Sequence, residues 1–206
     1  MTGRPSREAV MTALFNQLVN SIVTNFTANT QAGQQTLSSP STTSGLFVGL
    51  PVFGAGIPRG SVIETITPTL TISEPATATA TGGSLTTGFL TTTRRGKFTT
   101  DVPQPALWLR GIAEELEYQG LMQAQTIKAE FIVSTDAGQD PDAVPETALN
   151  NFLDAIQASL KPDSPTGQFT LGGLVAWCRM VGKIDKAPGD LGPIGIAIGG
   201  IEIIVP

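Results

Sequence analysis

The sequence contains no histidine and a single cysteine, Cys178. Without histidine, the chain has no Ser-His-Asp or Cys-His nucleophile and lacks the imidazole ligands of most zinc sites. A single cysteine excludes a disulfide within the chain and a thiolate metal cluster. We therefore predict no enzymatic activity, no metal and no cofactor, and we interpret Cys178, next to Trp177, as a small buried hydrophobic residue.

Charged side chains are also scarce. They make up 14% of the residues, and 17 acidic against 12 basic residues give a formal net charge of −5. This balance argues against a basic nucleic-acid binder, and a low charged fraction fits a protein whose faces are covered by neighbours. No apolar run approaches ~18 residues, the length of a membrane span. Residues 1–7 lack the apolar segment of a signal peptide, so we expect a soluble protein used inside the cell that makes it.

Residues 131–160 give the clearest structural pattern. An apolar, β-branched start predicts a strand, and a loop rich in Asp, Gly and Pro follows. A helix can begin at Pro145, because its missing N–H is not needed in the first turn. Apolar residues then recur at three- and four-residue spacing, at Leu149, Phe152, Leu153, Ile156 and Leu160. Such an amphipathic helix, ended by Pro162, must lie on another layer, which we expect to be a sheet.

The N-terminal part combines a helix with a long β-rich segment. Ser6 can cap a helix with one apolar face that runs to about Thr24. From residue 28 to 91, the sequence is rich in Ser, Thr, Gly and Pro, with alternating patterns at 61–66 and 69–72. Either a disordered linker or a small all-β module fits this composition, and the alternation favours the module.

The remaining segments predict strands on both sides of the second helix. They cover residues 105–110, 124–135, 180–184 and 194–205, and the near-continuous hydrophobicity of the last one predicts burial on both faces or against a second subunit. We therefore predict an α+β fold, with an antiparallel sheet of about four to five strands and two helices packed on it. Residues 1–27 and 92–206 would form this core domain, and residues 28–91 an inserted Ig-like or small sandwich module.

Two groups of acidic residues could suggest a calcium site or a pair of catalytic carboxylates, but their positions in the sequence fit neither. Asp136, Asp140 and Asp142 do not follow the calcium-loop pattern, and no glutamate stands at its closing position. We expect them to cap a helix and form turns. Glu114, Glu115 and Glu117 precede Tyr118, and adjacent positions on a predicted strand point to opposite faces, so no pair of these carboxylates converges. We interpret this group as a solvated edge.

Arg94, Arg95, Lys97 and Arg110 form the densest group of cations in this acidic chain. They fit solvated charge at a strand end. They also fit a local positive patch that faces an acidic neighbour or DNA passing nearby. We retain these four residues as a candidate interface or lumen patch.

Several segments, in order, resemble the tail terminator proteins of long-tailed bacteriophages, also called tail completion or minor tail proteins. They are TTRR (92–95), DPDAVP (140–145), LN with LDAI (149–150 and 153–156), TLGGLV (170–175) and IEIIV (201–205). The likeness covers residues 4–27 and 90–206. Residues 28–91 depart from the family pattern, and GLPV (49–52), GAGIPRG (54–60) and EPAT (74–77) look like a small β module of other phage virion proteins.

The resemblance implies a small α/β sandwich that assembles into a six-membered ring. Such a ring caps the finished tail tube, stops its growth and presents a surface for joining the head. The implied partners are other copies of the chain, the major tail tube protein and a head-completion, stopper or connector protein, with DNA only passing through the lumen and no membrane. The implied location is the virion neck, after assembly in the host cytoplasm.

Two alternatives stay open at this point. One is another neck component, such as a head-completion or stopper protein. The other is a scaffold that carries a surface- or glycan-binding β module at 28–91. That segment has only three aromatic residues, Phe47, Phe53 and Phe89, which is few for a glycan-binding surface.

Overall fold

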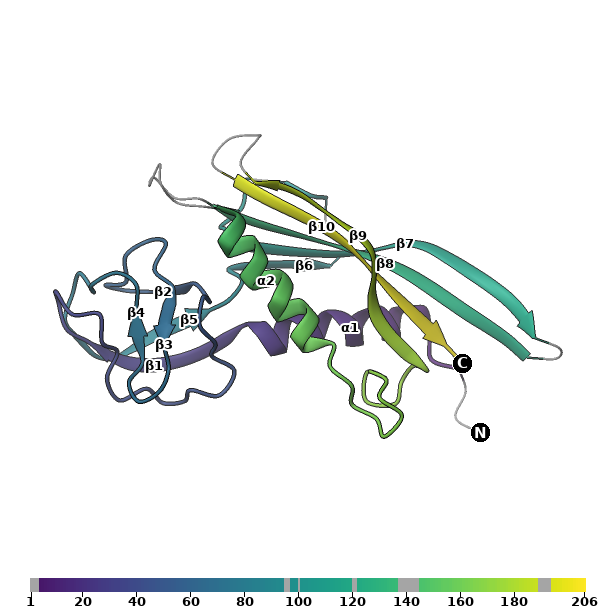
Figure 1. Cartoon of the computed structure of the whole chain (residues 1–206), viewed down its shortest axis with the longest axis horizontal. Helices are drawn as coiled ribbons and strands as arrows, with labels where there is room; N and C mark the ends of the chain where they lie inside the picture. The colour runs from purple at the N-terminus through teal and green to yellow at the C-terminus, as the bar shows by residue number, and fades with distance from the viewer. Residues whose placement is uncertain (1–3, 95–96, 100, 120–121, 137–144, 189–193) are drawn as a thin grey trace.

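The computed structural model describes residues 4–94, 97–99, 101–119, 122–136, 145–188 and 194–206. Within these residues lie two helices and ten strands (Figure 1). The helices are α1 (Arg7–Ile22) and α2 (Pro145–Ser159). The strands are β1 (Thr24–Thr30), β2 (Val52–Gly54), β3 (Ile63–Thr65), β4 (Thr71–Ile72), β5 (Ala80–Thr87), β6 (Thr91–Arg94), β7 (Ala106–Gln119), β8 (Met122–Asp136), β9 (Trp177–Pro188) and β10 (Ile194–Val205).

The predicted α+β class is wrong, because the chain is mostly β. Strands hold 44% of the residues and helices 16%, in sheets of three, two and five strands. The three-stranded sheet (β1-β5-β2) and the two-stranded sheet (β3-β4) are not helix-packed sheets. The five-stranded sheet is mixed rather than antiparallel, because β6 runs parallel to β7. The prediction gave weight to two strong helical stripes and underestimated how many short, Thr-rich strands residues 24–94 contain.

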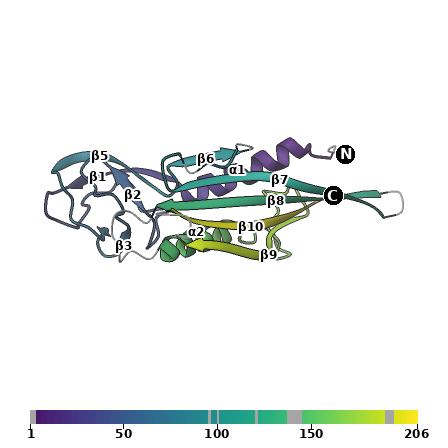
Figure 2. The ribbon, with the colours of Figure 1, turned by 90° about the horizontal axis from the view of Figure 1, so that it is seen from above.

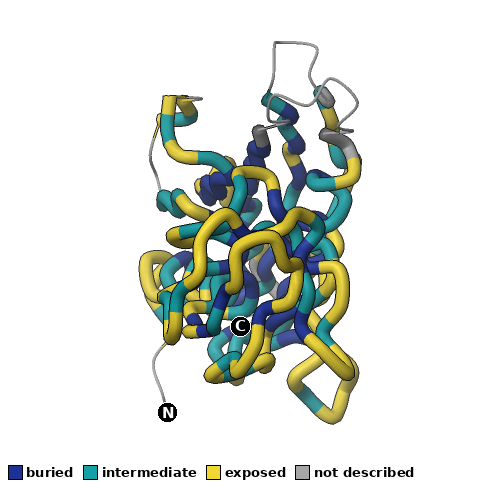
Figure 3. The backbone as a smooth tube through the Cα atoms, turned by 90° about the vertical axis from the view of Figure 1, so that its left-hand side faces the viewer, coloured by how far each residue is buried: buried dark blue, intermediate teal, exposed yellow. Residues whose placement is uncertain are grey.

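The two small sheets gather at one end of the molecule. β5 pairs with both β1 and β2, and β3 pairs with β4 at the place where the alternating patterns predicted strands. In the view onto this end (Figure 3), exposed and half-buried backbone surrounds the buried segments. Apart from residues 24–27 of β1, which fall in the predicted core, these elements come from the segment 28–91 that was predicted as an inserted module. Its standing as a separate domain remains a prediction.

Helix α1 begins as the sequence predicts. The Ser6 side chain accepts a hydrogen bond from the Ala9 N–H at 3.1 Å, which satisfies one free donor of the first turn. Only Val23 separates α1 from β1, and its N–H still donates to the Val19 carbonyl at 2.8 Å. Helix and strand therefore form one nearly continuous length of regular backbone (Figure 1).

The five-stranded sheet has the order β6-β7-β8-β10-β9, with β6 and β9 on the outside (Figure 2). β7 and β8 form a long antiparallel hairpin, paired from Ala106↔Ser134 to Gln119↔Met122. β6 pairs only with the first residues of β7, from Thr91↔Ala106 to Arg94↔Leu109. The far part of the hairpin projects beyond the rest of the molecule (Figure 1). We call residues 110–117 and 124–128, where β7 has lost β6 while β8 still pairs with β10 as far as Gln125, the hairpin arm.

β10 lies between β8 and β9, and its burial alternates. The buried positions are 195, 197, 199, 201, 203 and 205, whereas the residues that alternate with them are half-buried or exposed. Burial on both faces is therefore wrong for the single chain. Gly199 is required by packing, because a Cβ there would lie 2.4 Å from Cζ of the Phe131 ring.

α2 begins at Pro145, as predicted, and its apolar stripe is buried. The helix contacts α1 and strands β8, β9 and β10. It also reaches the small sheets. The Phe152 ring stacks on Phe89 with 4.3 Å between centroids, and the Asn151 amide donates to the Gly49 carbonyl at 3.2 Å.

Buried side chains divide by the face of the large sheet. The helix-side face, with Leu107, Leu109, Phe131 and Val133, belongs to one cluster that continues through α1 and α2 into the small sheets. The other face, which we call the outer face, holds a small cluster of Ala106, Trp108 and Ile132. One apolar core thus joins both ends of the molecule.

Candidate functional site

Cys178 and the acidic side chains are the described groups to compare with the predictions on nucleophiles and metal ligands. Cys178 is buried, and desolvation raises the pKa of its thiol to about 12. It is therefore protonated at neutral pH and is no nucleophile. No set of three or more Cys, Asp or Glu side chains that could hold a metal ion occurs among the described residues. Among the helices described, none is long and apolar enough to cross a membrane.

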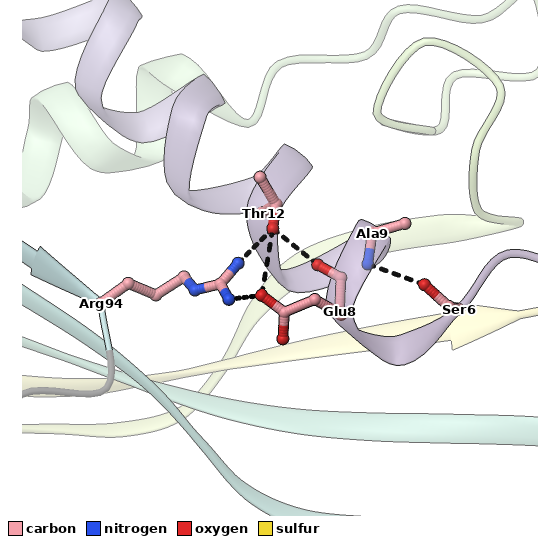
Figure 4. Close-up of polar contacts among 5 residues, drawn as sticks. All are labelled: Ser6, Glu8, Ala9, Thr12 and Arg94. Carbon is pink, nitrogen blue, oxygen red and sulfur yellow. Dashed lines mark hydrogen bonds and ion pairs between the residues drawn. The ribbon is translucent and has the colours of Figure 1, made fainter.

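The predicted cationic patch does not form a single surface. The Arg94 guanidinium points to α1, where it forms an ion pair with Glu8 and a hydrogen bond with the Thr12 hydroxyl (Figure 4). The Thr12 hydroxyl in turn donates to the Glu8 carbonyl at 2.7 Å. Arg94 is only 16% exposed. Its visible role is to fix the end of β6 against the first turns of α1.

Arg110 belongs to the opposite side of the sheet. Its guanidinium meets Glu130 at 2.5 Å, next to the outer-face pair of Trp108 and Ile132. Lys97 is exposed, and Arg95 lies outside the described residues. The structure therefore places Arg94 and Arg110 on different faces, and the role of the four cations as an interface or lumen patch remains a prediction.

The outer face carries a row of alternating charges that crosses the sheet. Arg179 on β9 lies 3.5 Å from Glu202 on β10, and Glu202 is the register partner of Lys128 on β8. Lys128 forms an ion pair with Glu115 on β7. The hydrogen bond and the charge of Glu115 raise the pKa of Lys128, and Glu202 adds to the effect. We call these four residues the charge row.

The charge row ends at two sheet edges that are open in the single chain. Arg179 is 64% exposed and Glu115 is 56% exposed. In the described part of the chain, β9 pairs only with β10, and β7 beyond Leu109 pairs only with β8. A cleft of about 550 Å³ lies beside this open part of β7, lined by Arg7 and Met11 from α1, Ile127 from β8 and residues 110–114 of β7.

The hairpin arm exposes apolar side chains. Ile112 is 54% exposed and Leu116 is 49% exposed. They alternate with the predicted acidic edge, of which Glu114 pairs with Arg7 at 2.5 Å and Glu115 with Lys128. Glu117 is exposed. The solvated edge that the sequence predicts is thus present, but it has partners from α1 and β8.

Other predicted sites find less support in the described residues. Asp140 and Asp142 lie outside them, as does most of the DPDAVP segment. Phe47 and Phe53 are half-buried and Phe89 is buried, so the segment 28–91 presents no exposed aromatic cluster. Sequence reasoning missed the charge row, because its four members are far apart in the chain and only strand register brings them together.

No protein-family model matches the chain, and no curated protein matches it significantly. The functional assignment therefore depends on the surface described above and on the segment resemblance.

Proposed function

We propose that the chain is a structural protein of the phage virion. It would form a ring on the end of the tail tube, stop the polymerisation of the tube and provide the surface for head-to-tail joining. The observation that supports this most is the β7 half of the hairpin arm, an exposed stretch with apolar side chains at a free edge. The segment resemblance supports a ring as the type of assembly. The partners would be the tube protein on one face of the ring and a head-completion, stopper or connector protein on the other.

The β7 half of the arm leaves apolar side chains at an open edge. The β8 half pairs with β10 from Gln125↔Val205 to Lys128↔Glu202, whereas the β7 half has no second strand partner among the described residues. Residues 110–117 are all exposed, with exposed fractions of 54% for Ile112 and 49% for Leu116. A neighbouring subunit would remove this surface from water, which is favourable by about 25 cal/mol per Å² of apolar area. The arm therefore fits an assembly element better than a free surface loop.

The first test is association with purified tail tubes, followed by analytical ultracentrifugation and electron microscopy. We expect the chain to form a ring and to locate at one end of the tubes, and to prevent further addition of tube subunits. A chain that stays monomeric and does not bind tube ends at any concentration contradicts the proposal. A ring found elsewhere in the neck would identify a stopper or head-completion protein instead.

The second test concerns the arm. We expect the double variant Ile112→Ser, Leu116→Ser to lose ring formation and tube capping while it keeps its fold. Val48→Ser is a matched control, because Val48 is 58% exposed but lies in the segment of the small sheets, not on the arm. Normal capping by the arm variant, or equal loss in the control, would argue against a role of the arm.

A further inference from the structure

We infer that copies of this chain join edge to edge, with the open part of β7 in one copy beside β9 of the next, and with Glu115 facing Arg179 of that next copy. The inference rests on the proposed ring and adds its joint and register. It follows from three features: two open edges, opposite charge at those edges and opposite strand direction.

Both edges have unpaired backbone groups over a useful length. β9 is the last strand of the sheet, and among the described residues only the strand β10 pairs with it. Its Cys178 N–H donates to the Phe169 carbonyl at 2.8 Å, so its free edge begins at Met180. β7 loses β6 after Leu109 and is open from Arg110 to the end of the arm within the described residues. Open edges of this kind bind a further strand when one with suitable side chains is supplied. The two edges lie on opposite sides of the same sheet, so one molecule can use both at once (Figure 2).

The charges select which edges meet. On β9, Arg179 is 64% exposed and Lys183 forms an ion pair with Asp185 at 2.5 Å, whereas the open part of β7 presents Glu115 and Glu117. Two copies of Arg179 would place cations against each other, and two copies of Glu115 would place carboxylates against each other. Like-charge contacts of this kind suppress wrong partners. Arg179 of β9 against Glu115 of β7 brings opposite signs together.

The charge row also defines the register. Across one copy it reads Arg179, Glu202, Lys128, Glu115, so the signs alternate from the β9 edge to the β7 edge. Placing Arg179 of the next copy beside Glu115 continues the alternation without a break. Cross-strand pairs of opposite charge stabilise a sheet, and a shift by one residue would move the side chains to the other face.

The strand directions agree with this joint. β7, β8, β10 and β9 are successively antiparallel, so β7 and β9 run in opposite directions. Rotation about an axis along the strands preserves this opposition, and β7 of one copy then meets β9 of the next in the antiparallel arrangement that most of the sheet already uses. Each copy contributes two different edges, so the contact is heterologous and closes into a ring when the rotation per copy divides a full turn.

Charge-reversed variants test the joint by mixing. Glu115→Arg makes both ends of the charge row positive, and Arg179→Glu makes both ends negative. We expect each variant alone to associate at least tenfold more weakly than the wild type, in a salt-dependent manner. An equimolar mixture should recover rings in which the two variants alternate, as shown by light scattering and native mass spectrometry. Lys161→Glu is a control with the same change in charge as Arg179→Glu, at an exposed residue after α2, and should assemble normally.

Covalent trapping gives a second measurement that does not depend on charge. Cysteines introduced at positions 115 and 179 of a Cys178→Ser chain should oxidise into a ladder of linked subunits, and each single-cysteine chain should stop at dimers. Recovery on mixing together with the ladder supports the joint. Charge-reversed variants that assemble like the wild type overturn it. A mixture of the two variants that stays unassembled, together with a double-cysteine chain that forms no ladder, also overturns it. Wild-type rings that pass these tests but do not cap tubes would refute only the proposed function.

Discussion

The continuous core predicts that the small sheets and the large sheet unfold together, and Leu85→Ala tests this. Leu85 on β5 is 1% exposed and belongs to the same cluster as Phe131 and Phe152. Truncation of a buried leucine to alanine destabilises a protein by about 2–5 kcal/mol. At about 2.1 cal/mol/K per residue, 206 residues give an unfolding entropy of about 0.43 kcal/mol/K. The melting temperature should therefore fall by about 5–12 °C.

Two optical probes make the test specific. Trp108 and Trp177 both belong to the large sheet, so tryptophan fluorescence reports on that sheet alone, whereas far-UV circular dichroism reports on all strands. If one core unfolds as a unit, both signals shift equally in Leu85→Ala. Ser84→Ala, at the exposed neighbouring position of β5, should change stability by less than about 0.5 kcal/mol. If Leu85→Ala lowers the melting temperature seen by circular dichroism but leaves the one seen by fluorescence unchanged, the two parts unfold separately. That result would refute the reasoning.

Three further predictions concern single residues. Gly199→Ala should destabilise the chain by about 1–3 kcal/mol in urea unfolding, because its Cβ would lie 2.4 Å from the Phe131 ring, while Gly111→Ala, with nothing within 4 Å, should lack this clash. Cys178 should react with a thiol reagent at pH 8 only after unfolding, because burial raises its pKa to about 12; rapid reaction of the native protein would contradict its burial. For Asp163, desolvation raises the pKa, but hydrogen bonds from the Gly172 N–H, the Thr170 N–H and the Thr170 hydroxyl lower it by more. The carboxylate therefore stabilises the fold above the ordinary pKa of Asp and loses this effect as the pH falls through the lowered pKa. The difference in unfolding free energy between wild type and Asp163→Asn should thus be largest near pH 7 and shrink towards pH 2. A difference that stays constant with pH would be evidence against this role of Asp163.

Much of the element order could be predicted from local patterns. The cap at Ser6, the start at Pro145 and the span of β10 follow from capping chemistry, proline geometry and apolar content, all of which act over a few residues. Fold class could not be judged this way. β7 continues through residues 110–119, because its partner β8 holds it in register. Residues 110–117 are all exposed, so no burial pattern signals a strand there.

The candidate surface was even less accessible from the sequence. Arg94 and Arg110 looked like one cationic group, but their strand positions send them to opposite faces. Arg179, Glu202, Lys128 and Glu115 looked unrelated, yet three strand pairings align them. Spacing along the chain predicts helix faces well, since neighbours on a helix are three or four residues apart. It says little about residues that meet across a sheet.

The near-unbroken passage from α1 into β1 has a mechanical consequence. Sixteen helical and seven extended residues span roughly 45 Å. This strut carries Arg7, the partner of Glu114, at one end and a strand of the small sheets at the other. A push on β1 must either travel along the strut to the base of the arm or break the link between the Val23 N–H and the Val19 carbonyl. A load applied at the small sheets is thus transmitted to the distant edge where Glu114 and Glu115 lie.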